Sequence, residues 1–122
     1  MKSLIIIVSS VMLLFLGCNK SSDYGVNNNN NNITGPNVIS VGGTSFSPNS
    51  LNVNVGDTVK FVWSNGSHTT TAVSVPQGAA TWNSPLNSSS TSFFYVVTVA
   101  GTYNFHCNIH YSMGMVGSFT AH

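Results

Sequence analysis

Four side chains in the chain have the chemistry to bind a soft metal ion. Cys107, His110 and Met115 lie within nine residues of one another, and His68 lies far upstream. A thiolate, two imidazoles and a weakly bound axial thioether are the ligands of blue-copper electron-transfer sites. Thiolate and thioether suit Cu(I), whereas imidazole suits either oxidation state of copper. This set therefore predicts a copper centre that changes oxidation state with little change in geometry.

The spacing of three of these residues suits a single short loop. Two residues separate Cys107 from His110, and four separate His110 from Met115. A tight turn can therefore bring the three donors together, and Gly114 gives the backbone beside the methionine more freedom. The fourth donor, His68, must come from a different strand of the fold.

Other chemistries account for the same residues less well. Zinc could occupy the thiolate and the imidazoles, but it gives no reason for the methionine. A cysteine nucleophile needs a base, and His110 is better placed to share a metal ion with Cys107. Asp57 is the only carboxylate after residue 37, which excludes catalysis by paired carboxylates. No glycine-rich nucleotide loop is found in the sequence.

Residues 1–18 are predicted to be an export signal that is not part of the fold. Lys2 precedes a mostly apolar segment, 4–16, and polar residues follow directly. Gly17-Cys18 resembles the end of a bacterial lipoprotein signal, in which the cysteine is lipidated and becomes the new N-terminus. We therefore expect an exported protein, periplasmic or at the cell surface, anchored to a membrane by a lipid on Cys18. An uncleaved anchor or a secretory signal cut slightly later are the alternatives.

Residues 19–37 are predicted to be a disordered linker, because the Asn27–Asn32 run and its polar neighbours have almost nothing to bury. A copper-binding domain then spans 38–122. If Cys18 is lipidated, Cys107 is the only thiol of that domain and has no internal disulfide partner. Metal binding gives a free thiol a role in an oxidising compartment. A disulfide between Cys18 and Cys107 is the alternative.

Charged residues make up only 4% of the chain. No cluster of cationic side chains provides a surface for nucleic acid, so we expect no nucleic acid to bind. We expect a monomer whose contacts with protein partners depend weakly on salt.

The pattern of residues 38–122 predicts an all-β fold, a two-sheet Greek-key β-sandwich. Short β-branched and aromatic runs between turn residues predict strands at 38–41, 51–55, 58–63, 69–75, 93–99, 102–107 and 116–121. No segment has a convincing helical period, although 76–90 leaves room for a helical turn. The candidate core residues are Phe46, Phe61, Trp63, Phe93, Tyr95, Tyr103, Phe105 and Phe119. If Cys107 faces inward, strand alternation turns Tyr103 and Phe105 inward and His106 outward.

The chain resembles the cupredoxins, the blue type 1 copper proteins, and within them the plastocyanin and pseudoazurin branch. The resemblance covers nearly all of 38–122, and its motifs are 46–48, 55–59, 61–65, 101–107, 107–110 and 114–117. It implies one type 1 copper per chain, with the ligands His68, Cys107, His110 and Met115. It also implies an electron carrier, not an enzyme, that exchanges electrons with redox protein partners.

The resemblance also implies roles for individual residues around the copper. The family register selects Met115 for the axial position, while Met113 is the competing thioether. Some members have asparagine after the first histidine ligand, where Thr69 stands here, and the threonine hydroxyl could make a similar bond. In the family the exposed edge of the second histidine is the electron exit. Ile109, Tyr111 and Met113 could form an apolar collar around His110.

His106 lies beside the predicted cysteine ligand. Copper nitrite reductases and multicopper oxidases have a histidine next to this cysteine and use it to feed a second copper centre. We therefore keep an accessory copper domain of a larger redox enzyme complex as an alternative. A copper-binding or copper-storage lipoprotein without a redox partner is another, and a domain that has lost its metal is a third.

Overall fold

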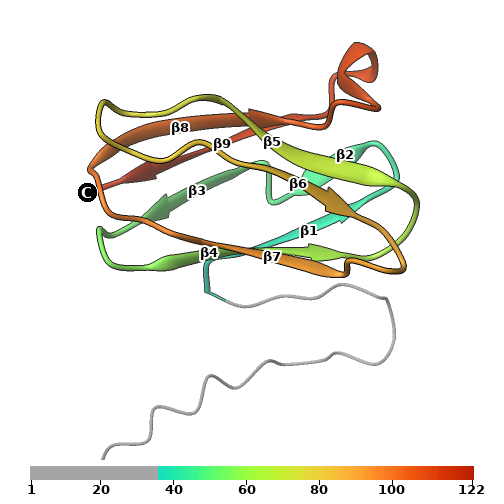
Figure 1. Ribbon diagram of the computed structural model, residues 1–122, viewed down its shortest axis with the longest axis horizontal. Helices are drawn as coiled ribbons and strands as arrows, with labels where there is room; N and C mark the ends of the chain where they lie inside the picture. Colours follow the sequence, from blue (N-terminus) through green and yellow to red (C-terminus); the bar gives the residue numbers. More distant parts are fainter. Residues whose placement is uncertain (1–35) are drawn as a thin grey trace, which may run out of the picture.

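The computed structural model describes residues 36–122, which form two β-sheets packed face to face (Figure 1). The predicted signal of 1–18 and most of the predicted linker of 19–37 lie outside the described residues. Within the part of the chain that is described, no helix has the length and apolar character needed to cross a membrane.

The described residues contain strands β1 Val38–Gly42, β2 Ser45–Ser47, β3 Ser50–Val53, β4 Thr58–Trp63, β5 His68–Ser74, β6 Asn83–Leu86, β7 Ser92–Val96, β8 Gly101–His106 and β9 Val116–Ala121. A single 3₁₀ turn in this region, η1 Tyr111–Met113, interrupts the loop between β8 and β9. The predicted all-β sandwich is confirmed.

The two sheets are mixed in direction. One has the strand order β2-β1-β4-β7 and the other β3-β9-β8-β5-β6. β1 runs parallel to β4 and β3 runs parallel to β9, whereas the remaining neighbours are antiparallel. Because β5 and β8 are antiparallel neighbours, the first residue of β5 and the residue after β8 lie at the same end of the sandwich.

Aromatic side chains from both sheets fill the space between them. Phe105 of β8 contacts Phe46 and Phe61 edge to face, at ring-centroid distances of 4.9 and 5.0 Å. Tyr103 stacks on Phe119 at 4.5 Å. Each of these five aromatic side chains is at least nine-tenths buried. For Tyr103 and Phe105 this is the inward orientation that the alternation of β8 predicts. The other predicted core residues are Tyr95, which is buried, and Trp63 and Phe93, which are half-buried.

The stretch 76–90 differs from the expectation of a helical turn. It contains turns and the edge strand β6, whose Pro85 is tolerated because an edge strand leaves one set of amides unpaired. Trp82, absent from the predicted core, is buried, and its indole N–H donates to the Thr70 hydroxyl at 3.1 Å.

The strand β7 ends at Val96, earlier than predicted. The next residue, Val97, makes its backbone bonds with the Gly56-Asp57 turn rather than with a strand.

Candidate metal centre

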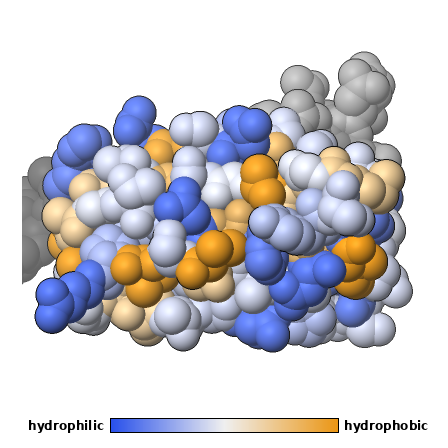
Figure 2. Space-filling view, turned by 90° about the horizontal axis from the view of Figure 1, so that it is seen from above, coloured by the Kyte–Doolittle hydropathy of each residue, from blue (hydrophilic) through white to orange (hydrophobic). Residues whose placement is uncertain are grey.

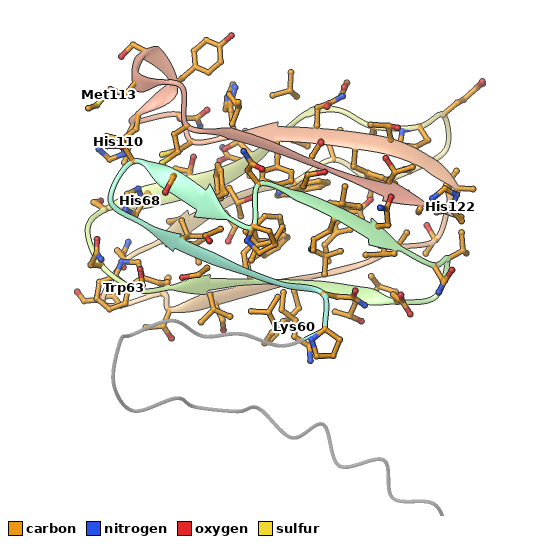
Figure 3. The ribbon with its side chains drawn as sticks, turned by 180° about the vertical axis from the view of Figure 1, so that it is seen from behind. Lys60, Trp63, His68, His110, Met113 and His122 are labelled. Atoms are coloured by element: carbon orange, nitrogen blue, oxygen red, sulfur yellow. The ribbon has the colours of Figure 1, made fainter. Side chains whose placement is uncertain are left out.

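The four predicted ligands lie at one end of the sandwich. Figure 3 labels two of them, His68 and His110, at that end. His68 is the first residue of β5, and Cys107 directly follows the last residue of β8. His110 caps η1, and Met115 directly precedes β9. Antiparallel pairing of β5 with β8 thus brings together residues that are 39 positions apart in the sequence.

Three donor atoms converge at this end. The Nδ1 atoms of His68 and His110 are 3.2 Å apart. Cys107 Sγ lies 3.6 Å from the His110 Nδ1 and 4.0 Å from the His68 Nδ1. Metal–nitrogen bonds of about 2.0–2.1 Å and metal–sulfur bonds of about 2.3 Å, as for zinc, put trigonal donors roughly 3.5–3.8 Å apart. The three atoms are therefore spaced to share one metal ion.

The ring of His68 is held in the orientation that metal binding needs. Its Nε2–H donates to the Asn65 carbonyl at 2.8 Å, which leaves a lone pair on the Nδ1 that faces Cys107. Burial lowers the pKa of His68, the bond to Asn65 opposes this shift, and the nearby His110 adds to the lowering. The neutral form, the one that can bind a metal, is thus favoured in the folded protein.

The cysteine is fixed by Thr69, the residue after His68. Cys107 is fully buried, and the Thr69 backbone N–H donates to its sulfur at 3.4 Å. The Thr69 hydroxyl accepts the N–H of Asn108 at 2.9 Å. This is the bond expected from threonine at a position where some family members have asparagine, and that expectation is confirmed.

Thr69→Val should remove the hydroxyl that holds the Asn108 amide while keeping the backbone bond to the sulfur. Loss of a hydrogen bond that orients a ligand typically lowers metal affinity by about 10–100-fold, and we expect the low end of that range. Competition titration with a copper chelator measures the affinity, and voltammetry should show a shifted reduction potential.

Thr102→Val is the matched control, because Thr102 makes a similar side-chain bond, to Thr120, on an exposed pair remote from the centre. An equal change of affinity in both variants would contradict a bracing role for Thr69.

Met115 is the better placed of the two candidate thioethers. Its carbonyl accepts the Cys107 N–H at 3.1 Å, and its own N–H donates to the His110 carbonyl at 3.3 Å. The Met115 side chain is fully buried, whereas the Met113 side chain is 64% exposed. The backbone therefore ties Met115 to the two neighbouring predicted ligands, Cys107 and His110, while Met113 lies at the surface.

His110 is the most accessible of the three converging residues, as expected from its place in the loop. It is partly exposed, whereas His68 and Cys107 are buried. The predicted collar residues Ile109, Tyr111 and Met113 are all more than half exposed.

A groove of about 470 Å³ lies beside Tyr111, over the outer face of the five-stranded sheet. Figure 2 views the molecule from the side of β8 and β9 and shows separate hydrophobic groups among polar ones.

His106 is turned away from the converging donors, as strand alternation predicts. Its Nε2 bonds to the Asn108 amide oxygen at 2.8 Å, and its ring lies 4.7 Å from that of Tyr111. Within 36–122, the only group of at least three histidine, cysteine or carboxylate donors close enough to share a metal is the one already described. The described residues therefore contain no second group of metal donors around His106.

The site depends on two residues that sequence reasoning did not assign. The carbonyls of Asn65 and Gly66 accept bonds from the His68 ring and from the Trp63 indole, at 2.8 and 2.7 Å. The Asn-Gly pair indicates a turn in the sequence, but only the folded loop shows that this turn holds the ring of His68, a predicted ligand.

Comparison with known proteins finds similar sequences. The family model described as a cupredoxin-like domain matches residues 5–121. A plastocyanin from Prochlorothrix hollandica is 38% identical over 80 residues, covering 62% of this chain and 61% of the relative. A pseudoazurin from Paracoccus pantotrophus is 35% identical over 78 residues, covering 62% of this chain and 52% of the relative. The chain thus spans less than two thirds of the length of these two curated relatives.

The solved structures include similar folds. The oxidized plastocyanin from Dryopteris crassirhizoma matches with a TM-score of 0.60 and 26% identity, over 70% of this chain and 99% of that protein. The similarity therefore extends over essentially that whole structure.

Proposed function

The chain belongs to the cupredoxin-like family, and from this premise we propose that it is a single-domain type 1 copper protein that carries electrons between redox partners. The observation that supports this most is the convergence of the His68 and His110 Nδ1 atoms with the Cys107 sulfur at the end of the sandwich. A soft thiolate with two imidazoles suits copper, and a buried thioether in the same loop completes the blue-copper donor set.

When bound, copper would supply a couple that gains and loses one electron. The chain's contribution is to hold its donors in place beforehand. His68 is fixed by the Asn65 carbonyl, and Cys107 by the Thr69 amide and by its own bond to Met115. Since these bonds involve backbone groups of β5 and of the adjoining loops, the donors are already held in place and need not rearrange when the charge of the centre changes.

His110 provides the path to a partner. It is partly exposed at the end of the molecule, inside the collar of Ile109, Tyr111 and Met113. A partner that docks on the collar comes within contact distance of an imidazole that is itself a ligand. We propose no catalytic role, and a storage site would not need this histidine to be accessible.

Met115→Leu and Met113→Leu together test the assignment of the axial ligand. Leucine has nearly the volume of methionine, so the fold should be retained in both variants. We expect Met115→Leu to keep copper and to shift the reduction potential, because the axial ligand tunes that potential. Met113→Leu, at an exposed position, should leave the potential unchanged. Voltammetry of both variants decides, and a shift in Met113→Leu alone would show that the proposed register is wrong.

We also propose that the protein is exported and held at a membrane by a lipid on Cys18, with 1–18 as its signal and 19–37 as its linker. The charge and apolar pattern of the leader supports this, as does the Gly17-Cys18 ending. A flexible linker of this length spans on the order of 25 Å root mean square. The folded domain would then work close to the membrane surface.

A further inference from the structure

The outer face of the four-stranded sheet carries two exposed apolar side chains, although this face points away from the core. The outward residues of β4 and β7 are Thr58, Lys60, Val62, Ser92, Phe94 and Val96, and we call them the β4–β7 outer face. Phe94 is 56% exposed and Val96 is 58% exposed. Outward positions of a sheet with one wet face are usually polar. Large exposed apolar side chains side by side indicate a contact surface.

The chain enters the domain beside this face. β1 is the parallel neighbour of β4, and the Asn37 carbonyl accepts the Lys60 backbone N–H at 2.9 Å. Lys60 is in turn the cross-strand partner of Phe94. Figure 3 shows Lys60 close to the point where the described chain begins. A linker that leads to Cys18 therefore leaves from the layer that carries Phe94 and Val96.

The charge of the face is compatible with lipid headgroups. Lys60 is the only lysine or arginine in 36–122, and none of the outward residues of β4 and β7 is a carboxylate. The only carboxylate side chain of this region, Asp57, precedes β4 and accepts bonds from the Asn37 side chain and the Asn54 amide. No acidic group of the β4–β7 outer face would thus oppose contact with anionic lipid.

We propose that the β4–β7 outer face rests on the lipid surface that holds Cys18, an inference that depends on the lipid tether proposed above. A tether raises the effective concentration of the domain at the surface, so a contact too weak to recruit a free protein is sufficient. Phe94 and Val96 would lie in the headgroup region, as apolar residues of interfacial segments do.

This placement also orients the metal centre. η1 follows β8 of the five-stranded sheet, on the layer opposite β4 and β7 (Figure 1). His110 and Met113 are separated from Lys60 by the thickness of the sandwich in Figure 3. With the β4–β7 outer face on the lipid, the collar around His110 remains open to a partner that approaches from the aqueous side.

The test uses the full lipidated chain in vesicles of phosphatidylethanolamine and phosphatidylglycerol with brominated acyl chains, which quench tryptophan. The added tryptophan is placed either at Phe94→Trp or at Val73→Trp, a matched position that is 59% exposed on the other sheet. Trp63 and Trp82 contribute the same background emission to both variants. We expect the brominated lipid to quench most of the emission added by the tryptophan at position 94. The emission added by the tryptophan at position 73 should persist. Adding Val96→Asp to Phe94→Trp should restore most of the lost emission.

Sedimentation of the same vesicles separates the two proposals. Protein that stays in the supernatant would overturn the tether and, with it, the membrane contact. Protein that sediments with equal quenching at both positions would overturn the contact alone. The membrane contact would also be overturned if the tryptophan at position 94 were shielded from aqueous acrylamide in the absence of vesicles, because something other than lipid would then cover this face. Concentration-dependent shielding would indicate a second copy of the chain, and concentration-independent shielding the chain's own N-terminal segment.

Discussion

Replacing Cys107 with serine should abolish the intense visible absorption of the copper-loaded chain completely while leaving the sandwich folded. The colour of a blue-copper centre depends on the thiolate bound to Cu(II), and a serine hydroxyl is neither soft nor ionised at neutral pH. The sulfur is fully buried and makes no disulfide, so its replacement removes a donor but no covalent link of the fold. Absorption spectroscopy measures the colour, and circular dichroism measures the fold.

Cys18→Ser is the matched control for this change. It removes the other thiol of the chain, which lies outside the proposed domain, and should leave the visible spectrum of the copper-loaded protein unaltered. If Cys107→Ser kept the colour, or if Cys18→Ser lost it, the assignment of the thiolate ligand would be wrong.

Gly66→Ala should weaken copper binding by about 10–100-fold, the usual cost of disturbing a group that orients a ligand. Gly66 has φ of +80°, and a Cβ added there would lie 2.7 Å from the Nε2 of His68. The ring must then move away from the Asn65 carbonyl that fixes it. The Trp63 bond to the Gly66 carbonyl restrains the loop, which limits how far the backbone can shift instead.

Gly78→Ala separates this effect from backbone strain. Gly78 also has a positive φ, +88°, but a Cβ there would meet no atom within 4 Å. Both variants should lose stability by about 1 kcal/mol, because alanine is disfavoured in the left-handed region. Thermal unfolding of the metal-free protein measures that shared loss, and chelator competition measures affinity. If the two variants bound copper equally well, Gly66 would have no role in positioning His68.

Local patterns in the sequence predict the ligand loop and the strand leading into it. The spacing of Cys107, His110 and Met115 specifies a turn, and alternation along β8 fixes which residues face inward. His68 is different, because its role depends on the pairing of β5 with β8 across 39 residues of separation. Only the accompanying motif, and no local signal, identifies a lone histidine in a polar loop as a ligand.

The parts of the fold that sequence reasoning missed are short or carry mixed signals. β2 has only three residues and one buried side chain, too few for an alternating pattern. β6 contains Pro85, which argues against a strand unless an edge position is already known. Trp82 lies in a stretch rich in turn residues, and the partner that satisfies its buried indole N–H, the Thr70 hydroxyl, comes from β5.

Titration of the full chain with Cu(II), followed by visible absorption through a cycle of reduction and reoxidation, tests the central proposal most directly. We expect an intense visible band that saturates at one copper per chain, disappears on reduction and returns fully on oxidation. A pale spectrum, no saturable binding or a colour that reduction destroys irreversibly would contradict a type 1 electron-transfer centre built from His68, Cys107, His110 and Met115.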